Sequence, residues 1–146
     1  MKLGELLKKT EASGVYLLDE AIPASEVEHL VRGLDFTFFH LQGSRILSKT
    51  DFLIEIAATL RFPDYFGYNW DALADCMTDI TGGDENSRVI LFDRFDLFAE
   101  NSPAEFATAL EIFGESAIFL SQRGIGCFVL LQGRRSAAPE LPKVEN

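Results

Sequence analysis

The sequence predicts an α/β protein in which helices pack on a parallel sheet of three strands, with a fourth strand available from the N-terminal segment. Segments of strand character alternate with segments of helical character, without the short turns typical of β-hairpins. The runs 88–92 and 127–131 are continuously apolar, which is typical of parallel strands covered on both faces. A chain of 146 residues with 47% hydrophobic residues is long enough for one domain with its own core.

The first 34 residues are expected to form an N-terminal extension of this core. Residues 1–13 are compatible with a short amphipathic helix or with a loose arm. Residues 14–18 predict a strand, and residues 23–33 predict a helix with Pro in its first turn and Gly at its end. The extension would add a strand and a helix to one edge of the core.

The core itself is expected over residues 35–133. It begins with an aromatic strand at 35–42, followed by a helix that starts at a capping signal in 48–51 and stops before Pro63. A later helix starts at 102–105 and either continues to Gln122 or breaks at Gly114. The other expected elements are a loop at 79–87, a strand at 88–92, a short helix at 93–100, a last strand at 127–131 and a flexible tail at 134–146.

Residues 62–78 are the most informative stretch, because they predict an aromatic loop that leads into a short helix. Asn69 is a good N-cap, and Asp71 lies in the first turn, where the helix dipole favours an anion. At about 100° per residue, one helix face is apolar and the other is acidic. The apolar face contains Ala72, Leu73, Cys76, Met77 and Ile80, and the opposite face contains Trp70, Asp71, Ala74, Asp75 and Thr78.

The acidic face can be explained in two ways. Asp71 and Asp75 are four residues apart and repel each other by a few tenths of a kcal/mol, and such a face is commonly only a solvated surface. Here, however, Trp70 shares the face and residues 65–68 add further aromatic side chains. Exposed carboxylates beside exposed aromatic rings favour a protein contact surface.

The same stretch resembles the barstar family of ribonuclease inhibitors. The resemblance extends upstream through 50–52 to Gly43, and downstream Gly126 and Cys127 resemble the start of the family's last strand. It covers residues 36–132 and implies a barstar-like fold with a three-stranded parallel sheet. The residues that carry it are Pro63, Tyr65-Phe66-Gly67, Asn69, Asp71-Ala72-Leu73 and Asp75-Cys76.

The resemblance also implies which residues bind a partner. In the family, the acid that matches Asp75 enters the nuclease active site as a mimic of phosphate, and the acid that matches Asp71 assists it. The chain departs from the family at Ala74, where the archetype has Trp, and at Ser121, where it has a contacting Glu. The remaining expected contact residues are Tyr65, Gly67, Asn69, Trp70 and Thr78, with Ala74 in the same surface.

Composition limits the class of partner. The net charge of −10 argues against direct binding of nucleic acid, whose phosphates would be repelled, and favours a basic protein reached by electrostatic steering. No segment approaches the ~20 apolar residues of a membrane span, and the N-terminus lacks the apolar run of a signal peptide. The two cysteines lie far apart in sequence and are expected to be free thiols in a reducing bacterial cytoplasm.

Catalytic chemistry has weaker support. Asp71 and Asp75 could act as an acid–base pair or hold Mg²⁺, but no third ligand accompanies them. His40 lies in an apolar strand and is expected to be a satisfied core residue. Cys76 and Cys127 have no His or Lys near them in sequence to activate the thiol. No cofactor, no metal and no enzymatic activity are therefore expected.

These observations lead to one expected function and two alternatives. We expect a cytoplasmic inhibitor of a ribonuclease or RNase-type toxin, an immunity protein or antitoxin that caps the cationic active site in a 1:1 complex. The first alternative is an acidic binding module of the same fold for another basic protein. The second is a small hydrolase that uses Asp71 and Asp75.

Overall fold

The computed structural model describes residues 1–81 and 84–146 of the chain. The strands are β1 (Gly14–Leu18), β2 (Thr37–Leu41), β3 (Arg88–Asp93), β4 (Cys127–Gln132) and β5 (Lys143–Val144). The α-helices are α1 (Leu3–Leu7), α2 (Ala24–Gly33), α3 (Lys49–Leu60), α4 (Trp70–Thr78), α5 (Phe95–Asn101) and α6 (Pro103–Ser121). The short 3₁₀ helices are η1 (Thr10–Ala12), η2 (Gly43–Arg45) and η3 (Arg135–Ala137).

The sheet has five parallel strands in the order β2-β3-β4-β1-β5, so the expected three-stranded sheet is wrong. The strands expected within the core, β2, β3 and β4, are adjacent to one another. On the far side of β4, the N-terminal strand β1 pairs with it and is followed by β5. The sequence pattern identified the core strands, but a two-residue strand near the C-terminus leaves too short a pattern to be recognised.

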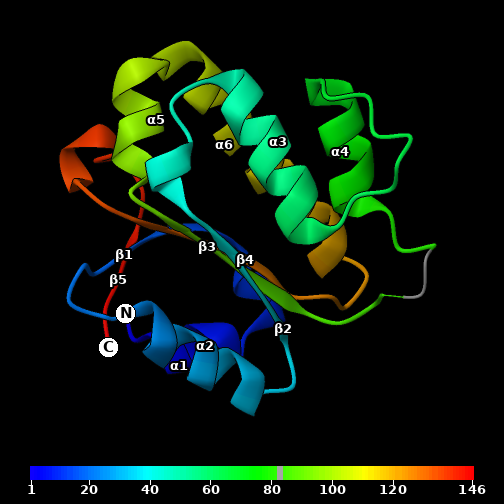
Figure 1. The fold of residues 1–146 in the computed structure, drawn as a ribbon. Helices are drawn as coiled ribbons and strands as arrows, with labels where there is room; N and C mark the ends of the chain where they lie inside the picture. The colour runs from blue at the N-terminus through cyan, green and yellow to red at the C-terminus, as the bar shows by residue number, and fades with distance from the viewer. Residues whose placement is uncertain (82–83) are drawn as a thin grey trace.

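Helices cover both faces of the sheet, which gives the molecule three layers (Figure 1). Helices α1 and α2 pack on one face through residues such as Leu6 and Val31. Helices α3 to α6 pack on the other face, where aromatic side chains dominate the core. Phe52 of α3 lies at the centre of that core, with ring centroids 5.4 Å from Phe98 and 6.0 Å from Phe92.

The two central strands explain the uninterrupted apolar runs in the sequence. Five consecutive residues of β3 and five of β4 are buried, because helices cover both faces of the sheet at this point. The edge strand β2 is only half-buried over most of its length. His40 of β2 is not enclosed in the core as expected: its side chain is 30% exposed, and its Nε2 lies 2.6 Å from Asp93 Oδ2.

The two ends of the chain are ordered against each other. The N–H of Leu3 donates to the carbonyl of Glu145, and the N–H of Glu145 donates to the carbonyl of Met1, both at 2.8 Å. Val144 is 1% exposed in the core beneath α1 and α2. The structure of residues 134–146 therefore differs from the flexible tail that their composition predicts. Figure 1 shows both termini beside the same edge of the sheet.

The remaining helices follow the sequence signals closely. Ser48 accepts a hydrogen bond from the N–H of Asp51 at the start of α3, and α6 continues through Gly114 without a break. Of the loop expected over 79–87, residues 79–81 and 84–87 lie outside helices and strands, while Gly82 and Gly83 fall outside the described residues. Among the residues that the structure describes, no helix has the length and apolar character needed to cross a membrane.

Candidate functional site

Helix α4 presents two carboxylates to solvent from a well-fixed backbone. Asn69 caps the helix by accepting a hydrogen bond from the N–H of Ala72 at 2.8 Å, as predicted. Leu73 and Met77 are buried in the core and hold the opposite face in place. Asp71 and Asp75 are exposed, and neither forms an ion pair with any described residue. Both therefore remain available to a partner.

The loop before α4 adds exposed aromatic surface. Phe66 is buried and anchors the loop, with its ring 5.1 Å from that of Phe62 and 4.8 Å from that of Tyr68. Tyr65 is 79% exposed and Tyr68 is 56% exposed. Gly67 is exposed, and a Cβ at this position would approach Asn69 Nδ2 to 3.0 Å. The loop thus exposes two tyrosine rings in the segment that leads directly into the acidic helix.

Three residues expected on the acidic face also make contacts within the protein. Trp70 is half-buried: its Nε1 donates to Glu105 Oε2 at 3.2 Å, and its ring packs against the core. Ala74 is also half-buried against the core, and Thr78 donates back to the Ala74 carbonyl at 3.0 Å. Trp70 therefore links α4 to α6, and only part of its surface can contact a partner.

Asn69 likewise uses its side chain within the chain. Its Oδ1 forms the helix cap and its Nδ2 donates to the carbonyl of Gly67 at 3.2 Å. Its substitution would disturb the helix start as well as any contact with a partner.

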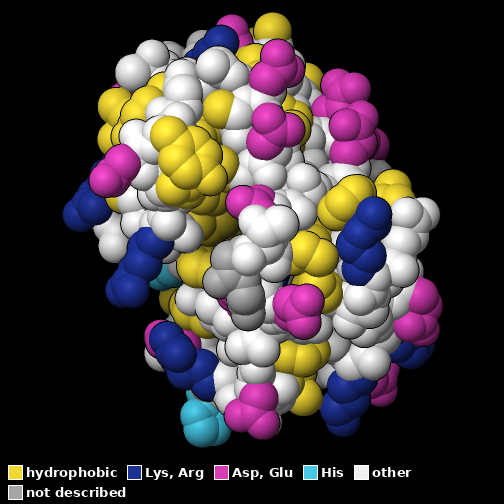
Figure 2. Space-filling model, turned by 90° about the vertical axis from the view of Figure 1, so that its right-hand side faces the viewer, with side chains coloured by type: hydrophobic (Ala, Val, Ile, Leu, Met, Phe, Trp, Pro, Cys, Tyr) yellow, Lys and Arg dark blue, Asp and Glu magenta, His cyan; other side chains and the backbone are white. Residues whose placement is uncertain are grey.

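Helix α6 extends the acidic surface beyond the residues that the sequence singled out. Glu111 and Glu115 are exposed and, like the carboxylates of α4, form no ion pair within the described chain. Figure 2 shows Asp and Glu side chains gathered over the upper part of the face that α4 presents, beside exposed hydrophobic side chains. The i, i+4 spacing of the two glutamates on a predicted helix was the signal that could have identified them.

Ser121 does not lie on the side of α6 that faces α4. Glu105 marks the side of α6 that faces α4, because it accepts the hydrogen bond from Trp70. Counting about 100° per residue, Ser121 lies about 160° away from Glu105 around the helix, whereas Glu115 lies about 80° away. Ser121 donates to the carbonyl of Ile118 at 2.9 Å. Around the axis of α6, Glu115 is thus oriented closer than Ser121 to the side that faces α4.

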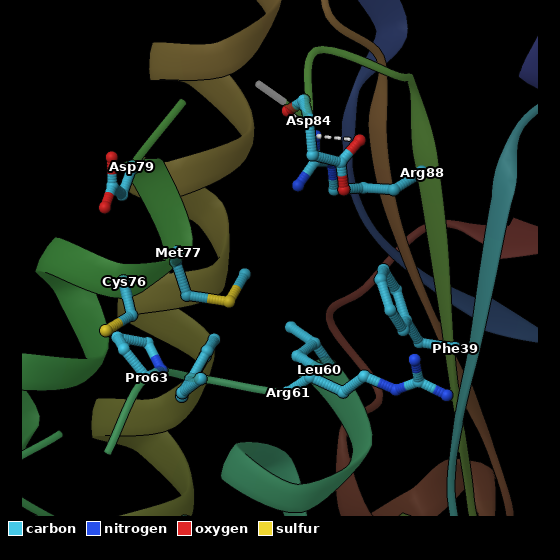
Figure 3. A pocket seen from close by; sticks show the side chains of 10 residues that line it. Phe39, Leu60, Arg61, Pro63, Cys76, Met77, Asp79, Asp84 and Arg88 are labelled. Carbon is cyan, nitrogen blue, oxygen red and sulfur yellow. Dashed lines mark hydrogen bonds and ion pairs between the residues drawn. The ribbon is translucent and has the colours of Figure 1, made fainter. Parts of the chain in front are cut away.

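A small groove lies between the C-terminal half of α4 and strand β2, with a volume of about 210 Å³ (Figure 3). Its charged groups are Arg61, Asp79, Asp84 and Arg88, and Asp84 lies 3.8 Å from Arg88. Burial raises the pKa of the Cys76 thiol in this groove, and the charges of Asp79 and Asp75 raise it further. A thiol with a raised pKa is a poor nucleophile, so the groove does not resemble a cysteine active site.

Comparison with known families identifies the chain. Its sequence matches the family "Barstar (barnase inhibitor)" over residues 36–132. The chain belongs to the Barstar family. The matched region contains α3, the aromatic loop, α4 and α6, and it supplies the adjacent strands β2, β3 and β4. Strands β1 and β5 come from outside the matched region, and this accounts for the difference between five strands and three. No curated protein matches the chain.

Solved structures with a similar fold come from proteins of another kind. The ORC2 protein of Aeropyrum pernix in its ADP form has 13% identity and a TM-score of 0.64, with 97% of this Barstar-family chain and 44% of ORC2 covered. Drosophila ORC bound to DNA has 13% identity and a TM-score of 0.61, and the match covers 97% of this chain and 38% of the Drosophila chain. A Walker-type ATPase of Pyrococcus abyssi has 10% identity and a TM-score of 0.57, and the match covers 97% of this chain and 51% of the ATPase.

These similarities concern the fold alone. The Barstar-family chain spans about half the length of these proteins or less, and identity is low throughout. They support the five-stranded parallel sheet with helices on both faces and overturn the expected three-stranded sheet. The sequence contains no G-x-x-x-x-G-K motif, so the likeness carries no argument for nucleotide binding.

Proposed function

We propose that this Barstar-family protein inhibits a ribonuclease or RNase-type toxin by inserting the acidic face of α4 into the enzyme's cationic active site. The observation that carries the proposal is the pair of exposed carboxylates, Asp71 and Asp75, on a capped helix and without a cation of their own among the described residues. The family supplies the class of partner, because the family is named for inhibition of a ribonuclease.

The chemistry of the partner explains why carboxylates suit this role. A ribonuclease must bind phosphodiesters, so its active site presents Arg, Lys or protonated His. A carboxylate on a rigid helix can accept the same charge-assisted hydrogen bonds that a phosphate would accept. Since α4 is held by its cap and by buried Leu73 and Met77, little conformational entropy is lost when Asp75 binds.

The surrounding surface supports the same orientation of the partner. Tyr65 and Tyr68 offer exposed aromatic rings on the loop that leads into α4, and Tyr residues are favoured at interfaces because they contribute large contact area at low entropic cost. Glu111 and Glu115 extend the negative field over α6. The net charge of −10 would accelerate encounter with a basic enzyme and disfavour direct binding of RNA.

We propose that the partner is a relative or functional equivalent of the archetypal ribonuclease, and that the residues around its active site differ from those of the archetype. Ala74 leaves a pocket that was shaped for Trp partly empty, and the Glu expected at Ser121 is missing. An unfilled pocket and an unpaired basic group would each weaken binding. We therefore propose that the chain inhibits its own partner more tightly than the archetypal enzyme. Side-by-side inhibition constants would test this, and equal tight inhibition of both would contradict it.

The central experiment is inhibition of RNA cleavage by purified protein, with Asp75→Asn as the test variant. Glu11→Gln is a matched control, because Glu11 is an exposed acid in η1, whose neighbour Ala12 packs against the core beneath α1 and α2, whereas α4 packs on the other face of the sheet. We expect Asp75→Asn to lose inhibition and Glu11→Gln to retain it. An Asp75→Asn variant that inhibits as tightly as the wild type would contradict the proposal.

The protein is proposed to act by binding and not by catalysis. We expect the purified chain to hydrolyse neither RNA nor other phosphoesters, with or without Mg²⁺ or Mn²⁺. Reproducible turnover that disappears in Asp71→Asn would instead favour a carboxylate-based hydrolase. Capture of a basic protein without nuclease activity, through the same residues, would favour a binding module for another partner.

A further inference from the structure

A second cavity lies outside the carboxyl ends of strands β1, β3 and β4. It has a volume of about 660 Å³ and is lined by Glu20, Asp93, Arg94, Asp96, Gln132, Gly133 and Arg134. The chain leaves β1 toward α2 on one face of the sheet, and leaves β4 toward η3 on the other face. The carboxyl ends of these two neighbouring strands thus form a topological switch point, where open α/β sheets commonly bind ligands.

Asp96 is the feature that the fold leaves incomplete in this cavity. The residue is 2% exposed, and its Oδ1 accepts no hydrogen bond from any described residue. Gly133 packs so closely that a Cβ there would come within 2.2 Å of this oxygen. A buried carboxylate oxygen without a donor is costly, so a ligand that supplies an N–H donor would be favoured here.

The guanidinium of Arg94 lies near Asp96 without completing its hydrogen bonds. Its Nε is 3.6 Å from Asp96 Oδ1, beyond hydrogen-bond distance, and 58% of the Arg94 side chain is exposed. Arg94 also has a left-handed backbone, with φ of 44°, which is uncommon for a residue other than glycine. An exposed side chain of this kind can move away and admit another cation to Asp96.

Among the other groups of the cavity, several acceptors lack a donor in the described chain, while the basic group Arg134 is engaged by Glu100. Gln132 uses its Nε2 on the carbonyls of Asp19 and Ile22, at 2.9 and 2.7 Å, which leaves its Oε1 without a partner in the described chain. Asp93 is already satisfied by His40 and by the N–H of Gly43. Arg134 is held by Glu100. Glu20, Asp96 and Gln132 Oε1 therefore have capacity for a positively charged donor of N–H bonds.

We propose that this cavity binds a small molecule through an ammonium or guanidinium group, which replaces the Arg94 guanidinium beside Asp96. A metal ion is disfavoured, because the described residues contain no group of three His, Cys, Asp or Glu side chains placed to hold one. The proposal is independent of the inhibitor function, since none of the residues involved belongs to α4 or its aromatic loop.

The test is an NMR titration of the ¹⁵N-labelled full chain with methylguanidinium and with ethylammonium. Tetramethylammonium, which has the same charge but no N–H donor, is the control ligand. We expect saturable shifts of the Gln132 and Gly133 amides with the first two compounds, and none with the third. Equal shifts with tetramethylammonium, or no saturable shift with any compound, would overturn the proposal.

Two substitutions with opposite expected effects sharpen the test. Asp96→Asn should weaken binding at least tenfold, because the charge at the cavity floor is lost. Arg94→Ala should tighten binding, because the competing cation within the chain is removed. If Asp96→Asn fails to fold, Glu20→Gln replaces it, since Glu20 is exposed and its loss should still weaken binding severalfold. Weaker binding in Arg94→Ala, or unchanged binding in the acidic variant, would show that the assignment is wrong.

Discussion

Replacement of Asp75 by Asn should change folding stability and partner binding in opposite directions. Asp75 is exposed, four residues after Asp71 and four before Asp79, and it has no ion pair in the described chain. In the free protein its charge is therefore a source of repulsion within α4. In the proposed complex the same charge would be buried against the cations of a ribonuclease.

The expected magnitudes follow from this placement. Relief of the Asp71–Asp75 repulsion should stabilise the free protein by about 0.2–0.5 kcal/mol, and the loss of repulsion with Asp79 acts in the same direction. For a chain of this size the melting temperature should rise by roughly 1–2 °C. Asp and Asn have similar helix propensities, so the change isolates the charge. Binding should weaken by about 3 kcal/mol, since the partner's cations would be left buried and unpaired.

Asp71→Asn supplies a contrast within the same helix. Asp71 lies in the first turn of α4, where the dipole stabilises an anion by about 0.3–1 kcal/mol, so its neutralisation should not stabilise the protein. The assays are thermal denaturation at ~20 mM and ~500 mM salt, and inhibition of RNA cleavage by each variant. The stability gain of Asp75→Asn should shrink at high salt. Destabilisation by Asp75→Asn, or inhibition as tight as that of the wild type, would refute the reasoning.

Three further predictions concern association, the C-terminal strand and the buried thiol. The rate of association with the nuclease, measured by stopped flow, should fall steeply between ~20 mM and ~500 mM salt. A rate that does not change with salt would show that the net charge does not accelerate association. Val144→Ala should cost about 1.6 kcal/mol in urea denaturation, because two buried carbon groups are lost, whereas a flexible tail would show no change. Burial raises the pKa of Cys127 from 9.0 to about 11, so the folded state favours the neutral thiol. The contribution of the thiol to the free energy of unfolding is therefore complete below pH 9 and falls as the pH rises toward 11. In Cys127→Ala, the free energy of unfolding should change less with pH over this range.

Local signals in the sequence were sufficient for most elements and for the central helix. Asn69 identified the start of α4, Ser48 that of α3 and Pro63 the end of the preceding helix, because capping and proline effects depend on residues only a few positions apart. The i, i+4 spacing likewise put Asp71 and Asp75 on one exposed face. These features need no information about distant parts of the chain.

The sequence alone therefore determined the alternation of strands and helices, the family resemblance and the acidic helix, since each depends on residues that are close together in the chain. Only the tertiary structure decided that Trp70 turns toward Glu105, that Val144 closes the sheet beside β1, and that Asp96 Oδ1 accepts no hydrogen bond from the described residues at the end of β3 and β4. Each of these depends on a contact between segments far apart in the chain. Such contacts are set by the order of the strands and the packing of helices on both faces of the sheet, which no local pattern records.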